Sequence, residues 1–166
     1  MQPGDDRPVT AYPTVVPMLA YEDPGAALDW LAKAFGFRER LRLEMPDGRI
    51  GHAEMDVGEN GVIMLATPSP DYEPPRKHRQ TCARAAAWLA VPYVVDGVLV
   101  HVANVEEHMA RARDAGATLL SELEDEPYGR LYRAEDLEGH RWMFMELPAE
   151  PASHETWQPP GEPSPE

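Results

Sequence analysis

Two stretches of this chain follow the same order of sequence features. Residues 15–66 have the sequence VVPMLAYEDPGAALDWLAKAFGFRERLRLEMPDGRIGHAEMDVGENGVIMLA, and residues 97–147 have the sequence GVLVHVANVEEHMARARDAGATLLSELEDEPYGRLYRAEDLEGHRWMFMEL. Each stretch begins with a strand-like apolar run, continues with an amphipathic helical segment, and ends with three short strand-like segments separated by turn residues. The repetition predicts two strand–helix–three-strand units and therefore an α+β fold.

Capping residues place the two predicted helices. The first helix is expected to begin after Asp23, with Pro24 at its first position, and to end at Gly36. The second is expected to begin after Asn104 and to end at Gly116. The apolar positions that share one face are Ala27, Leu28, Leu31 and Phe35 in the first helix and Val105, Met109 and Ala112 in the second.

Proline and charge divide the rest of the chain. We expect a flexible N-terminal arm (1–13), a first unit (14–67), a Pro-rich linker and connecting segment (68–96), a second unit (97–147) and a disordered, acidic, Pro-rich tail (148–166) that contains Trp157. The linker carries a basic cluster of Arg76, Lys77 and Arg79. Its last part has two open interpretations: a short helix over 82–90 that leads into a strand at 91–95, or a hairpin between two Val-rich strands that turns at Asp96-Gly97.

Composition excludes several classes of function. The chain has 166 residues with 29 acidic and 15 basic side chains, which gives a net charge of −14. Such an excess of acid argues against nucleic-acid and anionic-membrane partners. Its one cysteine, Cys82, excludes an internal disulfide and a cysteine-based zinc site. No membrane-spanning run or apolar signal core is present, so we expect a cytoplasmic protein.

Four motifs carry a family resemblance. They are LAYEDPGAALDWLAKAFGF, PDGRIGHAEM, HVANVEEHMARARDAGA and EPYGRLYRAEDLEGHRWMF. Together they resemble the vicinal oxygen chelate superfamily, which includes glyoxalases, bleomycin-resistance proteins and extradiol dioxygenases, and in particular its small bacterial PhnB-like, glyoxalase-like branch. The resemblance implies two βαβββ modules whose half-sheets wrap into a partly open mixed sheet around a cavity. It also implies a homodimer.

The resemblance further implies four metal-ligand positions, one on each of four strands. In this sequence they fall on Val16, on Leu65 (or Met64 with a one-residue shift), on Gly97 and on Met143. None of these residues supplies the nitrogen or oxygen ligand that a hard or borderline divalent ion requires. We therefore expect neither a metal nor another cofactor.

Strand alternation predicts what lines the cavity. If Met143 faces it, then Arg141 does too, and the segment HAEMDV places His52 and Glu54 on one face with Asp56. The predicted ligand-binding residues are Met18, His52, Glu54, Leu99, His101, Arg141 and Met143, with Tyr128 or Tyr132 at the rim. Apolar walls with a few convergent polar groups are typical of small-molecule sites.

Each polar candidate also has a structural interpretation. His52 and Glu54 would form an exposed cross-strand pair, His101 would be a core histidine, and Arg141 would pair with Glu54 or another carboxylate. The remaining histidines are predicted to lie on a helix surface (His108), in a turn (His140) and in the basic loop (His78).

Three hypotheses of function follow. The first is a metal-free protein that binds a small cationic or aromatic molecule, in the manner of drug-sequestering relatives. The second is a lyase or isomerase that uses His52, Glu54 or His101 for acid–base catalysis. The third is a partner-binding or regulatory module whose tail makes the contact.

Overall fold

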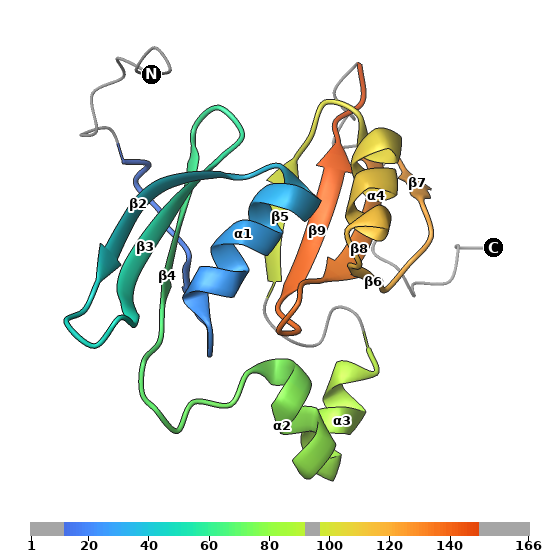
Figure 1. The fold of residues 1–166 in the computed structure, drawn as a ribbon. Coiled ribbons are helices and arrows are strands. Elements are labelled where there is room, and N and C mark those ends of the chain that lie inside the picture. Colours follow the sequence, from blue (N-terminus) through green and yellow to red (C-terminus); the bar gives the residue numbers. More distant parts are fainter. Residues whose placement is uncertain (1–11, 92–96, 150–166) are drawn as a thin grey trace.

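Two separate mixed β-sheets and four helices make up the described residues, 12–91 and 97–149, of this computed structural model (Figure 1). Neither sheet closes into a barrel. The predicted α+β class is therefore confirmed. The expected arm and tail, including Trp157, lie almost wholly outside the described residues. Within the part that the structure describes, no helix is long and apolar enough to cross a membrane.

The first sheet is formed by the first half of the chain. Its elements are β1 (Met18–Ala20), α1 (Pro24–Phe35), β2 (Arg38–Glu44), β3 (Ile50–Val57) and β4 (Gly61–Ala66). The strand order is β1-β4-β3-β2, with β1 parallel to β4 and the other pairs antiparallel. A parallel pair needs a crossover, and the segment from α1 to β3 provides it.

The second sheet repeats this plan with one added strand. Its elements are β5 (Gly97–His101), α4 (Val105–Asp114), β6 (Thr118–Leu119), β7 (Glu124–Glu126), β8 (Gly129–Glu135) and β9 (Arg141–Glu146). The order is β5-β9-β8-β6, with β5 parallel to β9, and the short β7 pairs with β8. This short strand was not predicted.

Both repeated helices begin at the predicted caps. The Asp23 carboxylate accepts a hydrogen bond from the Ala26 N–H at 3.0 Å, and the Asn104 side chain accepts one from the Glu107 N–H at 3.0 Å. The Glu146 carboxylate on β9 accepts a further bond from the Val105 N–H at 2.9 Å. The second helix start is thus held by its own sheet as well as by its cap.

One apolar core joins the two units. The predicted helix faces are all buried in it, and α1 and α4 lie side by side on the sheets (Figure 1). The ring of Phe35, at the end of α1, lies 4.6 Å from that of Phe144 and 5.5 Å from that of Trp142, both on β9. Burying a side chain of this size stabilises the fold by about 2 to 3 kcal/mol.

The linker contains two short helices below the sheets in Figure 1, α2 (Pro75–Thr81) and α3 (Ala83–Leu89). The first of them was not predicted, because PRKHRQT has no apolar face for the helical period to reveal. The second agrees with the helical interpretation of 82–90. The alternative hairpin falls largely on residues 92–96, outside the described part.

Candidate functional site

Each sheet has one face against the helices and one face away from them. On β3, Ala53, Met55 and Val57 belong to the core, whereas His52 and Glu54 alternate with them and point the other way. We call this second face, on both sheets, the open face. The predicted ligand-binding residues all lie on it: Met18, His52 and Glu54 on the first sheet, and Leu99, His101, Arg141 and Met143 on the second.

The polar part of the open face is centred on Glu54. Its carboxylate lies 2.9 Å from His52 Nε2 and accepts a hydrogen bond of 2.9 Å from the Tyr12 hydroxyl. The Arg40 guanidinium lies 3.6 Å from the same carboxylate and 4.4 Å from the centre of the Tyr12 ring. The Glu54 side chain is only 4% exposed, while His52 is one-third exposed. His52 is therefore held by a buried carboxylate and keeps one edge open to solvent.

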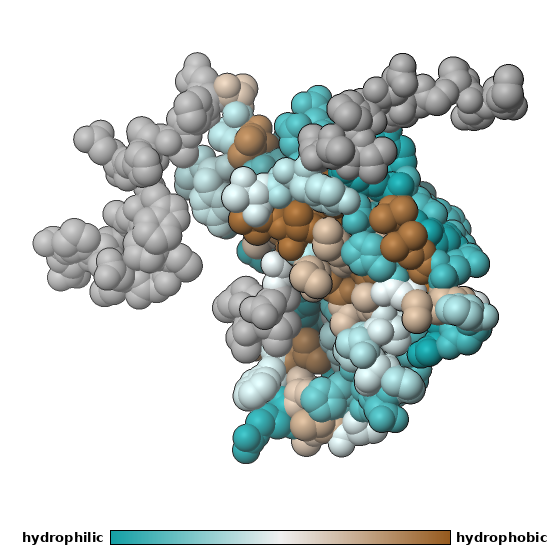
Figure 2. All heavy atoms as spheres, turned by 90° about the vertical axis from the view of Figure 1, so that its left-hand side faces the viewer, coloured by the Kyte–Doolittle hydropathy of each residue, from teal (hydrophilic) through white to brown (hydrophobic). Residues whose placement is uncertain are grey.

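The second sheet contributes an apolar strip to the open face. Leu99 on β5 is opposite Met143 on β9, and His101 is opposite Met145. Leu99 is half exposed and His101 is exposed, so the interpretation of His101 as a core histidine is wrong. On the side of the molecule where the first sheet lies, Figure 2 shows apolar patches among hydrophilic side chains.

Arg141 does not pair with Glu54, because Glu135 of β8 lies directly opposite it. Its guanidinium lies 3.1 Å from the Glu135 carboxylate and donates to two main-chain carbonyls at the end of α3, those of Leu89 and Val91. Arg141 is buried and Glu135 is fully buried. Of the two sequence interpretations, a structural ion pair describes Arg141 as it stands here.

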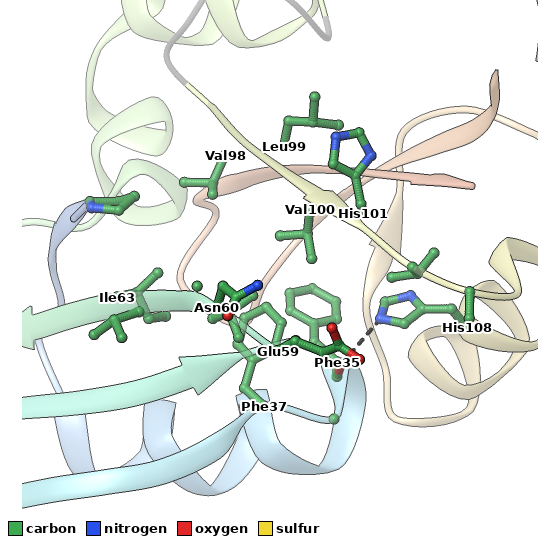
Figure 3. Close-up of a pocket in the computed structure, with 18 of the residues that line it drawn as sticks. Phe35, Phe37, Glu59, Asn60, Ile63, Val98, Leu99, Val100, His101 and His108 are labelled. Atoms are coloured by element: carbon green, nitrogen blue, oxygen red, sulfur yellow. Dashed lines mark hydrogen bonds between the residues drawn. The ribbon is translucent and has the colours of Figure 1, made fainter. Parts of the chain in front are cut away.

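A pocket of about 920 Å³ opens between the two units. It is bounded by the end of α1, the β3–β4 turn, β5 and the start of α4. Figure 3 shows Val98 and Val100 pointing into it towards Phe35 and Ile63, whereas Leu99 and His101 point to the other side of β5. Both of these side chains nevertheless belong to the pocket lining, so the pocket and the open face meet along β5.

His108 forms part of the pocket wall and is buried, which corrects its predicted place on a helix surface. Its Nδ1 lies 2.7 Å from the Tyr132 hydroxyl, and its Nε2 lies 3.2 Å from the Phe35 carbonyl oxygen. Burial lowers the pKa of His108 to about 4, so the neutral ring donates from Nε2 and accepts at Nδ1. The missed signal was the position of His108 on the same helix face as Val105, Met109 and Ala112. That spacing predicts a buried histidine.

Tyr132 is also not where the sequence predicted it. It was expected at the cavity rim, but its side chain is fully buried among the core aromatic rings. Burial raises the pKa of its hydroxyl. The other rim candidate, Tyr128, is partly exposed at the start of β8.

The sequence pattern that defines the Glyoxalase/Bleomycin resistance protein/Dioxygenase superfamily matches residues 14–144. The chain belongs to this superfamily. It is 32% identical over 149 residues to the protein Rv0887c of Mycobacterium tuberculosis (strain H37Rv), covering 86% of this chain and 79% of the relative. It is 31% identical over 142 residues to Mb0911c of Mycobacterium bovis, covering 82% of this chain and 84% of the relative.

Solved structures of the superfamily share this fold. TioX from Micromonospora sp. ML1 is 34% identical, with a TM-score of 0.58 over 80% of this chain and 97% of TioX. A glyoxalase/bleomycin resistance protein from Streptomyces sp. CB03234 is 17% identical, with a TM-score of 0.56 over 78% of this chain and 96% of that protein. The second likeness concerns the fold alone.

The superfamily fold implies a metal site, but the residues at the predicted ligand positions of this chain do not fit one. Three of the four predicted ligand positions, Val16, Gly97 and Met143, carry no nitrogen or oxygen donor in a side chain. At the fourth, Leu65 points into the core and Met64, opposite Glu54, takes the place on the open face. Alkyl and thioether groups do not fit a hard divalent ion. Among the described residues, no three His, Cys, Asp or Glu side chains are grouped to hold a metal.

Proposed function

We propose that this superfamily member is a metal-free protein that binds a small molecule on the open face. One observation carries the proposal. The positions at which the fold would place metal ligands are held by Val16, Met64, Gly97 and Met143, and we call this apolar set the apolar wall. Methionine side chains adjust to irregular ligands because they are flexible and polarizable.

The chemistry around this wall favours a cationic or aromatic ligand. The chain carries a net charge of −14, which attracts cations over long range. Apolar side chains on the open face, including Met18, Leu99 and Met143, offer contact to a flat apolar body. His101 lies beside them on β5 and supplies a polar group. Sequestration of a drug of this type is the function that these features support best.

A titration against cationic and aromatic antibiotics tests the proposal. Calorimetry measures binding, and the fluorescence of Trp30, Trp88 and Trp142 follows it. We expect at least one ligand to bind to the wild-type protein and Met143→Lys to weaken that binding at least about tenfold, because it puts a cation into the apolar wall. Met45→Lys is the matched control, since Met45 is half exposed in the β2–β3 turn.

Two results would overturn the proposal. One is the absence of binding across the whole panel, together with no protection of a host strain. The other is equal affinity of the Met143 and Met45 variants, because the ligand would then not contact the apolar wall. Stoichiometric nickel, zinc or iron in protein purified without chelator would contradict its metal-free part.

The contact between His52 and Glu54 favours a second candidate function, a lyase or isomerase. An imidazole that is one-third exposed and lies 2.9 Å from a buried carboxylate has a geometry that general bases use. His52→Ala would then abolish turnover of a substrate while leaving the far-ultraviolet circular dichroism unchanged. Unchanged turnover in this variant would exclude His52 as the base.

A further inference from the structure

The α2–α3 hairpin, residues 75–89, adds no side chain to the core of the protein. Neither of its helices has a buried residue, and Trp88 on α3 is 55% exposed. Helices of this length are marginal in water and normally depend on an apolar face packed against the fold. The attachment of this hairpin must therefore come from polar contacts.

Those contacts join basic residues of α2 to the turns of both units. The Arg76 N–H donates to the Glu138 carbonyl at 2.9 Å, and the Arg76 side chain donates to the Asp136 carbonyl at 2.8 Å. Lys77 pairs with Glu22 at the start of α1. Both of these side chains are about half exposed, so salt screens the pair effectively.

Glu135 connects the hairpin to the open face. Its buried carboxylate lies 2.9 Å from Arg79 on α2 and 3.1 Å from Arg141 on β9. Arg141 in turn donates to the carbonyls of Leu89 and Val91. The hairpin thus covers the end of the open face at which β9 begins.

Charge explains why the hairpin is held against the protein and why it can lift away. Residues 74–95 contain Arg76, Lys77, Arg79 and Arg84 but no acidic residue, while the whole chain carries −14. The basic hairpin is therefore drawn to an acidic protein by Coulomb attraction. If it lifts, Arg79 leaves Glu135 but Arg141 stays beside it, so the buried carboxylate keeps one partner.

We propose that the α2–α3 hairpin is a lid over the Arg141 end of the open face, latched by Glu135 and able to open without unfolding of the sheets. The part of this inference that concerns control of the ligand site rests on the proposed function. Opening frees the Arg141 N–H groups that now bind the carbonyls of α3. They then become donors for an oxygen atom of an aromatic ligand, so the lid controls access to hydrogen-bond donors at one end of the apolar wall.

Hydrogen exchange of the full chain, measured by mass spectrometry without ligand, tests the lid. Between about 20 mM and about 500 mM sodium chloride, the amides of residues 76–89 should exchange faster, while those of β8 and β9 keep their rates. If the hairpin amides exchange at the rates of β8 and β9 at every salt concentration, the hairpin opens only on global unfolding and the proposal is wrong.

A matched pair of arginine variants tests the latch. Arg79→Gln should raise hairpin exchange at least about tenfold, because it removes a charge-assisted bond to a buried carboxylate. Arg84→Gln on α3 removes the same charge from an exposed side chain and should leave the rate within about twofold. Equal rates in the two variants would overturn the role of Glu135. Because neither measurement uses a ligand, failure of the antibiotic titration would leave this result intact.

Discussion

Asp136 receives more hydrogen bonds than any other carboxylate described here. One oxygen accepts from the Tyr21 hydroxyl at 2.7 Å and from the Trp142 indole at 3.1 Å. The other accepts from the main-chain N–H groups of residues 138–140. Its side chain is fully buried between the two units. A single residue of the motif AEDLEGH therefore shapes the β8–β9 turn and ties it to Tyr21, the residue that follows β1.

Asp136→Ala should destabilise the protein by about 3 kcal/mol or more. The substitution leaves a buried hydroxyl, an indole and three backbone donors without their acceptor. The midpoint of urea unfolding measures the loss. Asp125→Ala is the control, since Asp125 is 81% exposed in its pair with Arg130 and should change stability by less than about 0.5 kcal/mol. Similar midpoints for the two variants would contradict this role of Asp136.

The burial of His108 predicts a pH dependence of stability. Its pKa is about 4 in the folded protein and 6.5 without burial, so the unfolded chain binds the proton first as the pH falls. Keeping His108 neutral and buried therefore contributes fully to the free energy of unfolding above pH 6.5. This contribution declines by up to about 3 kcal/mol as the pH approaches 4. The free energy of unfolding, measured with urea, should differ less between pH 7 and pH 4.5 in His108→Gln than in the wild type.

His78 provides the control for this pH dependence. It is exposed on α2, so His78→Gln should keep the wild-type difference between the two pH values. Carboxylates that titrate in the same range affect both variants equally. If His108→Gln also kept the full difference, the buried imidazole would not be its source.

The end of α1 depends on a glycine that meets a side chain of α4. Gly36 has φ +72°, and a Cβ there would lie 2.8 Å from the Arg111 guanidinium, which itself donates to the Phe35 carbonyl at 3.1 Å. Gly36→Ala should therefore lower the free energy of unfolding by about 2 kcal/mol, because alanine is strained in the left-handed backbone and because Arg111 is displaced. Thermal unfolding measures this cost.

Gly48→Ala separates the two causes. Gly48 also has a positive φ, +83°, but a Cβ there would meet nothing within 4 Å. This variant should lower the free energy of unfolding by only about 1 kcal/mol, because only the strain of alanine in the left-handed backbone remains. An equal loss of stability in the Gly36 and Gly48 variants would show that Arg111 does not hold the two helices together.

The secondary structure could be predicted from the sequence wherever the signal was local. Asp23 and Asn104 mark the helix starts, and the alternation in HAEMDV assigns the two faces of β3, because each signal depends on a few neighbouring residues. The helix α2 was missed because polar contacts with distant residues hold it. Of the two alternatives for the second ligand position, Leu65 faces the core and Met64 faces the open face; the sequence left both open because a shift of one residue inverts a strand.

For the whole molecule, the open face leaves apolar side chains in contact with water. Met18 is 79% exposed and Leu99 is 49% exposed, each on an edge strand. Exposed apolar surface of this kind marks interaction sites, and members of the superfamily often form dimers. We therefore propose that the chain is a homodimer in which a second copy covers part of the open face and the ligand is held between the two copies.

Sedimentation equilibrium tests this assembly. The wild-type protein should have twice the chain mass of 18.5 kDa, and the double variant Met18→Glu, Leu99→Glu should have the mass of one chain. Leu147→Glu adds an acidic group at a comparably exposed position beyond β9 and should leave the dimer intact. A wild-type protein that is monomeric at every concentration would exclude the dimer.

The sequence by itself determined the duplicated βαβββ order and the helix starts. These properties depend on residue types and short spacings, which can be read along the chain. Only the tertiary structure decided that Arg141 binds Glu135 and the end of α3, that His108 is buried, and that Asp136 joins the two units. The physical reason is that a polar side chain binds whichever donor or acceptor the neighbouring strand or helix brings within reach, and that neighbour comes from a distant part of the chain.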